Sequence, residues 1–132
     1  MSRIQWRSVL IVALRLVVTL LFVPAILVKL INPGAWARMF TTWGYPPWGA
    51  LVISIIEIIG LAALWIPAVA TWASAALMIT TAGATGTWLI HGPRITAAYP
   101  GAILVLVGVL ARLQQARARR DSRVRHPEPL SN

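Results

Sequence analysis

The stretch from Trp48 to Trp65 most constrains what this chain can fold into. Its residues are apolar except for Ser54 and Glu57, and Glu57 is the only acidic residue before Asp121. A run of this length can cross the hydrocarbon core of a bilayer, where an ionised side chain costs a few kcal/mol or more. We therefore expect Glu57 to have either a partner or a function inside the membrane.

Composition places the chain among membrane proteins. It has 132 residues, of which 58% are hydrophobic and 11% are charged, whereas a soluble domain carries about a quarter charged residues. Its apolar runs are long enough to cross a bilayer as helices, and no soluble domain fits between them. We therefore predict an all-α, polytopic membrane four-helix bundle over residues 1–115. The expected spans are about residues 8–31, 48–66, 69–90 and 96–113.

The segment between the first two expected spans is too short and too polar to cross the membrane. Within residues 35–47, Trp36, Phe40 and Trp43 recur at helical spacing beside polar residues. This pattern is typical of a short amphipathic helix that lies in the interface. The third expected span is rich in Ala, Gly and Thr, so we expect it to pack closely in the centre of the bundle.

The sequence contains no set of residues that performs chemistry by itself. Cysteine is absent, which excludes disulfides, thiolate metal ligands and iron–sulfur clusters in this chain. His91 and His126 are predicted on opposite sides of the membrane, which argues against haem ligation by two histidines. No catalytic triad, phosphate-binding glycine loop or carboxylate pair occurs in the apolar region. We therefore predict no catalytic residue and no metal ligand.

The basic residues predict the orientation in the membrane. The net charge is +9, and six of the twelve basic residues follow residue 111. Because basic residues favour the cytoplasmic side, both termini are predicted to be cytoplasmic. Residues 116–132 are expected to form a basic, disordered tail. This tail lacks interleaved aromatic residues, so anionic lipid is a better candidate partner than nucleic acid. The residues proposed for that contact are Arg117, Arg119, Arg120, Arg123 and Arg125.

Two charges inside the bundle are predicted to meet. Arg15 lies nine residues after Trp6, and Glu57 lies eight residues before Trp65. If the two tryptophans mark the same membrane face, both charges lie about 12–14 Å from it. Pairing them would reduce the cost of burying either charge. The pair would then fasten the first span to the second or line a polar pocket. A third interpretation is that the matching depth is coincidental.

Polar residues around Glu57 extend this candidate site. Ser54 shares a helical face with Glu57, and this face is expected to point into the bundle. Lys29 is either an interfacial lysine whose ammonium group reaches the headgroups or part of a pocket at the outer side. Threonines of the third span are expected at or beyond the depth of Glu57. The candidate ligand-binding residues are Arg15, Lys29, Ser54, Glu57, Thr80, Thr81 and Thr85.

The charged residues and turns follow one another in a distinctive order. In chain order the features are Arg15, Lys29-Leu30, Pro33, Phe40, the turn Gly44-Tyr45-Pro46, Glu57-x-x-Gly60, Leu64, Pro67 and Met78. From about Arg7 to Leu113 the chain thereby resembles the DoxX family of small four-helix bacterial membrane proteins. The resemblance implies a bundle in the bacterial inner membrane. Some relatives are membrane subunits of a thiosulfate:quinone oxidoreductase, and others are tied to redox complexes.

The resemblance and the buried charges together give a leading functional hypothesis. We expect an accessory subunit of a quinone-linked redox complex, which binds a quinone or similar lipid-soluble molecule near the Arg15–Glu57 pair. It would not be catalytic alone, and electrons would come from a redox partner protein. One alternative is a scaffold that recruits a partner or anionic lipid through its arginine tail. Another is a small transporter, which would require a homo-oligomer.

Overall fold

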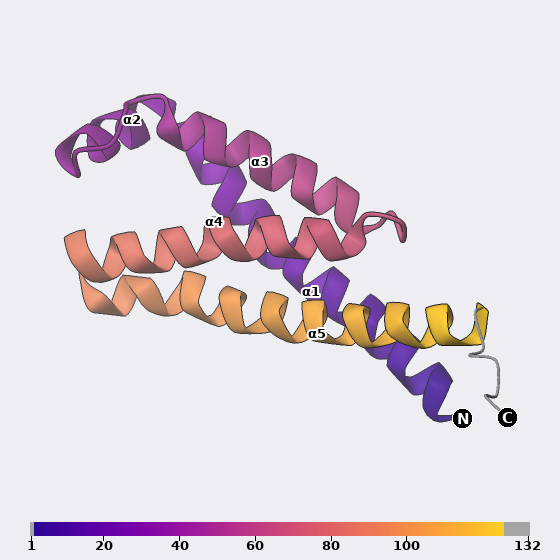
Figure 1. Cartoon of the computed structure of the whole chain (residues 1–132). Coiled ribbons are helices and arrows are strands. Elements are labelled where there is room, and N and C mark those ends of the chain that lie inside the picture. Colours follow the sequence, from indigo (N-terminus) through magenta and orange to yellow (C-terminus); the bar gives the residue numbers. More distant parts are fainter. Residues whose placement is uncertain (1, 126–132) are drawn as a thin grey trace, which may run out of the picture.

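A computed structural model describes residues 2–125 of the chain, except for the side chain of residue 4. Five α-helices and one short 3₁₀ helix account for most of these residues (Figure 1). The elements are α1 (Arg3–Ile31), α2 (Pro33–Thr42), α3 (Gly49–Leu64), α4 (Ala70–His91), η1 (Arg94–Ala97) and α5 (Ala98–Arg125).

The four longer helices run antiparallel in chain order, which confirms the predicted all-α bundle. The first turn of α1 and the last turn of α5 lie at one end, here called the terminal end, and α2 lies at the other, the α2 end (Figure 1). Three helices, α1, α4 and α5, are long and apolar enough to cross a membrane. Helix α3 is also apolar but has 16 residues, or about 24 Å of helix.

Helix α1 crosses the other three obliquely (Figure 1). It packs against both α3 and α5, while α4 lies between α3 and α5. Each of the four long helices thus packs against two others, and α4 is in this respect no more central than α1. The glycines of α4 do not make the close contact either, because a Cβ at Gly83 or Gly86 would meet nothing within 4 Å. The close approach comes from Gly60 on α3, which lies against the side chain of Leu77.

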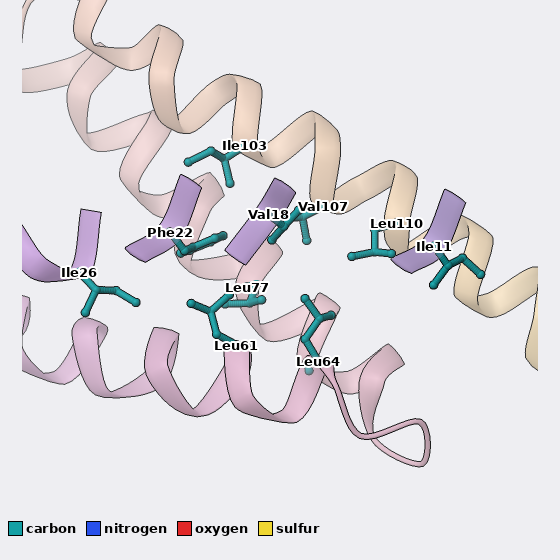
Figure 2. Packing of buried hydrophobic residues seen from close by; sticks show 11 residues of the cluster. Ile11, Val18, Phe22, Ile26, Leu61, Leu64, Leu77, Ile103, Val107 and Leu110 are labelled. Carbon is teal, nitrogen blue, oxygen red and sulfur yellow. The ribbon is translucent and has the colours of Figure 1, made fainter. Parts of the chain in front are cut away.

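The core is a cluster of aliphatic side chains and one phenylalanine, contributed by all four long helices (Figure 2). Val18, Leu64, Leu77, Val107 and Leu110 are fully buried within it. The outward faces of the same helices are also apolar, which suits a surface covered by lipid rather than water. Strongly exposed examples in the middle of these helices are Leu20, Ile59, Ile79 and Val105.

Helix boundaries follow ordinary capping chemistry. Ser2 and Gln5 form a capping box at the start of α1. Asn32 ends α1 and caps α2, because its side-chain oxygen accepts a hydrogen bond from the backbone N–H of Ala35. Pro33 then occupies the first turn of α2, where its missing N–H does no harm. The first helix therefore ends at residue 31, which is the predicted end of the first span.

An aromatic cluster closes the α2 end. Trp43, at the end of α2, packs edge-on against Trp88 of α4, with ring centroids 5.1 Å apart, and stacks on His91. Tyr45 packs edge-on against His91 and shares a hydrogen bond with Thr87 through its hydroxyl. The turn between them contains Gly44 at a φ of 81°, a conformation that favours glycine. The cluster attaches α2 and its following turn to α4.

Helix α5 continues well beyond the predicted fourth span. It extends through Arg125, so residues 116–125 are helical where the sequence predicted a disordered tail. Arginine, alanine and glutamine are good helix formers, and they extend a helix that the bundle has already nucleated. Residues 126–132 of the predicted tail lie outside the described residues.

Candidate functional site

Lys29 and Glu57 form a buried ion pair in the membrane region. The Lys29 ammonium group donates a hydrogen bond to a carboxylate oxygen of Glu57. Their side chains are only 11% and 7% exposed. Lys29 lies in the last turn of α1, and Glu57 lies on the inner face of α3. Within the part of the chain that the structure describes, no second ion pair occurs.

The predicted Arg15–Glu57 pair is wrong, and the register of α1 against α3 explains why. The indole N–H of Trp65 donates to the hydroxyl of Thr19, at 3.3 Å. Glu57 lies eight residues from Trp65, and Lys29 lies ten residues from Thr19, so both are about 12–15 Å toward the α2 end. Arg15 lies on the opposite side of Thr19. The prediction failed because the oblique α1 begins well beyond the end of α3, so Trp6 and Trp65 do not mark one depth.

Arg15 instead belongs to the terminal end of the bundle. It lies on the inner stripe of α1 between the buried residues Ile11 and Val18. Its Nε atom is buried and has no hydrogen-bond partner in the described part of the chain. Arg15 therefore does not contribute to the site around Glu57.

The inner face of α3 lies as predicted. Ala50, Ser54, Glu57 and Gly60 are all buried along one side of the helix. The Ser54 hydroxyl donates to the carbonyl oxygen of Ala50, at 2.9 Å. Its hydrogen is thereby used within the helix, while its oxygen can still accept a hydrogen bond.

The three threonines of the candidate site donate to their own helix. Because Gly60 lies against Leu77, Thr80 and Thr81 lie at about the height of Glu57, and Thr85 lies one turn farther toward the α2 end. The hydroxyls of Thr80 and Thr81 donate to the carbonyl of Leu77, and that of Thr85 donates to the carbonyl of Thr81. Their hydroxyl hydrogens are therefore used within α4, and only their oxygens remain as acceptors.

A groove of about 320 Å³ opens beside Lys29, between α2 and the first turn of α3. Its walls are mostly apolar, and of its lining residues only Lys29 and Trp48 carry side-chain hydrogen-bond donors. Trp48 and Leu51 are exposed at its edge, so the groove faces the lipid. The lining residues are Lys29, Pro33, Gly34, Ala37, Pro47, Trp48, Ala50 and Leu51.

The sequence had indicated Lys29 but not the residues around it. Of the two interpretations of Lys29, the structure favours the pocket over an ammonium that reaches the headgroups, because the ammonium group pairs with Glu57. The groove residues of α2 had no chemical signal, since they are small or apolar. A buried polar contact at the terminal end was also missed, in which the Ser74 hydroxyl lies 2.7 Å from Oε1 of Gln114. The spacing of Gln114 from Val107 and Leu110 on the inner stripe of α5 was the available signal.

Comparisons with known proteins address the whole bundle rather than this site. Searches of curated proteins and of solved structures gave no match. A family model described as the DoxX-like family matches residues 13–110. That range includes Arg15, Lys29 and Glu57 and ends before the arginines of α5. The match covers most of the chain, and the membrane protein described here belongs to the DoxX-like family.

Proposed function

We propose that this protein binds the carbonyl headgroup of a quinone, or of a similar lipid-soluble molecule, in the groove beside Lys29. The observation that carries the proposal is that the Lys29 side chain takes part in two features at once. It is neutralised by Glu57 and also lines a groove that faces lipid. A lysine that only fastened two helices would have no need of such a groove.

The groove suits a flat molecule with hydrogen-bond acceptors. Its volume of about 320 Å³ is at the lower end of the range for small-molecule sites, which are largely apolar with a few polar groups. An ammonium group has three N–H donors, and the bond to Glu57 uses one of them. The others and the indole N–H of Trp48 are suited to carbonyl oxygens, and the apolar walls are suited to a ring and its chain.

The residues of this chain would bind and orient the molecule rather than transfer electrons. A bound quinone supplies two-electron redox chemistry, and electrons would come from a partner protein of the same complex. Lys29 would polarise a carbonyl oxygen, and Glu57 would hold the Lys29 side chain in place. We accordingly propose an accessory role in a quinone-linked oxidoreductase of the bacterial inner membrane, with both termini in the cytoplasm.

Binding of a short-chain quinone to the purified protein tests the proposal. We expect the quinone to raise the melting temperature of the wild-type protein and of Arg15→Met, because Arg15 lies outside the groove. The Lys29→Met variant should lose this effect. Ala37→Phe should also lose it, because the added ring fills the groove while both charges of the ion pair remain in the chain. Equal stabilisation of wild-type and Ala37→Phe proteins would refute the proposed site.

Native lipid extracts provide a second test. Quinone should co-purify with the wild-type protein and with Arg15→Met, and it should be depleted from Ala37→Phe. If the protein carries no quinone and binds none when it is added, the ion pair is structural. The scaffold alternative would then be favoured.

A further inference from the structure

We propose that the arginine-bearing face of α5 binds the phosphate of an anionic phospholipid, whose acyl chains lie along Val105 and Val109. This site is at the terminal end, and it does not depend on the quinone groove at the α2 end. The proposal rests on the shape of the arginine face, its continuity with the lipid-facing side of α5, and the lack of ion pairs between these arginines and acidic residues within residues 2–125.

The arginines form a groove and not only a cluster of charge. A depression of about 410 Å³ lies along one side of α5. Its residues recur every three or four positions, which places them on one face of the helix. The lining residues are Arg112, Gln115, Ala116, Arg119, Arg120 and Arg123.

The same face continues into the membrane as an apolar surface. Val105 and Val109 are 66% and 45% exposed, and they lie seven and three residues before Arg112 on the same stripe. The change from valine to arginine therefore occurs within one helical turn. A phospholipid whose chains pack on the valines would have its phosphate at the level of Arg112 and Arg119, which are about 10 Å apart along the helix.

The opposite face of α5 fixes the direction of this groove. Leu110 is buried in the core, and Gln114 is buried against Ser74 of α4. These contacts prevent the helix from rotating about its axis, so the arginine face stays directed away from the bundle. Packing inside the protein therefore sets the direction in which the arginine face points.

The charge of the groove is not neutralised within the described part of the chain. Asp121 is the only acid of α5 in residues 98–125, and it lies on the side of the helix opposite the groove. None of the groove arginines forms an ion pair with an acidic residue in that part of the chain. A phosphate can accept paired hydrogen bonds from guanidinium groups, which makes it a suitable counterion.

The experiment compares two double variants of equal charge in the full-length protein. Arg112→Gln/Arg119→Gln alters the groove, whereas Arg117→Gln/Arg125→Gln alters other faces of α5. Each protein is reconstituted with defined mixtures of phosphatidylglycerol and phosphatidylcholine, and the retained lipid is counted by native mass spectrometry. We expect the wild-type protein and the control to retain phosphatidylglycerol preferentially. The groove variant should bind it roughly tenfold more weakly or worse.

Three outcomes would overturn the inference. Equal losses in the two double variants would mean that only net charge matters. If the wild-type protein shows no preference for phosphatidylglycerol, an anionic phospholipid is not the ligand of this site. Displacement of phosphatidylglycerol by inorganic phosphate at millimolar concentration would assign the site to a soluble phosphate. Circular dichroism checks that each variant is folded, and unchanged quinone binding by the groove variant would confirm that the two sites are independent.

Discussion

The indole of Trp65 bonds to the hydroxyl of Thr19 at 3.3 Å, and this contact marks the depth at which α1 and α3 meet. From that point the antiparallel helices bring Lys29 opposite Glu57 and leave Arg15 beyond the end of α3. The membrane region therefore contains one neutralised pair and one arginine without an acidic partner in the described part of the chain.

Removing the charge of Lys29 should lower stability much more than removing the charge of Arg15. Lys29→Met leaves Glu57 buried without its partner, which should lower the free energy of unfolding by about 3 kcal/mol. Arg15→Met removes a cation that has no acidic partner, so its cost should be below about 1 kcal/mol. Unfolding of both variants in the same detergent gives the comparison. A larger loss for Arg15→Met would contradict the observed pairing.

Removing both members of the pair should restore much of the lost stability. In Lys29→Met/Glu57→Gln no uncompensated charge remains, so we expect a stability within about 1 kcal/mol of wild type. The double variant should still fail to bind a quinone, because its groove lacks the ammonium group. A variant that is as unstable as Lys29→Met would show that the two side chains do not interact.

The contact between α3 and α4 should depend on one glycine. A Cβ at Gly60 would lie 2.9 Å from Cδ2 of Leu77, whereas a Cβ at Gly83 meets nothing within 4 Å. Gly60→Val should therefore cost about 1–3 kcal/mol through overpacking, and Gly83→Val should cost much less. Thermal unfolding measures both. Partial rescue of Gly60→Val by Leu77→Ala would locate the clash at this contact.

The buried contact between Ser74 and Gln114 should hold α5 in place. Ser74→Ala leaves the Gln114 amide without its hydroxyl partner, at a cost of about 1–3 kcal/mol. Ser74→Ala/Gln114→Leu replaces both polar groups by apolar ones and should recover most of that loss. Amide hydrogen exchange in residues 110–120 should be faster in Ser74→Ala than in the double variant. Faster exchange in the double variant than in Ser74→Ala would contradict this account.

Much of the fold could be predicted from apolar runs and their interruptions. Asn32-Pro33 marks the end of the first span because its residues cap one helix and begin the next. The inward direction of Glu57 was predictable because Ser54 and Gly60 share its face. These features depend on residues close together in the sequence.

The partner of Glu57 was not predictable in the same way, because it depends on the tilt and length of α1 relative to α3. Tryptophans indicate only that a helix end lies near an interface, so they do not fix the register between two helices of unequal length. The threonines were also predicted only as polar positions. Whether a hydroxyl donates to its own helix or across the bundle depends on neighbours that the sequence does not specify.

The short length of α3 has a consequence for the surrounding lipid. At about 24 Å it falls short of the roughly 30 Å hydrocarbon thickness that α1, α4 and α5 can match. A shorter apolar segment is accommodated by local thinning of the bilayer. Such thinning on the α3 side would bring the phospholipid glycerol backbones closer to the mouth of the Lys29 groove. Hydrophobic mismatch at α3 would thereby shorten the distance between the headgroup region of the bilayer and the Lys29 side chain.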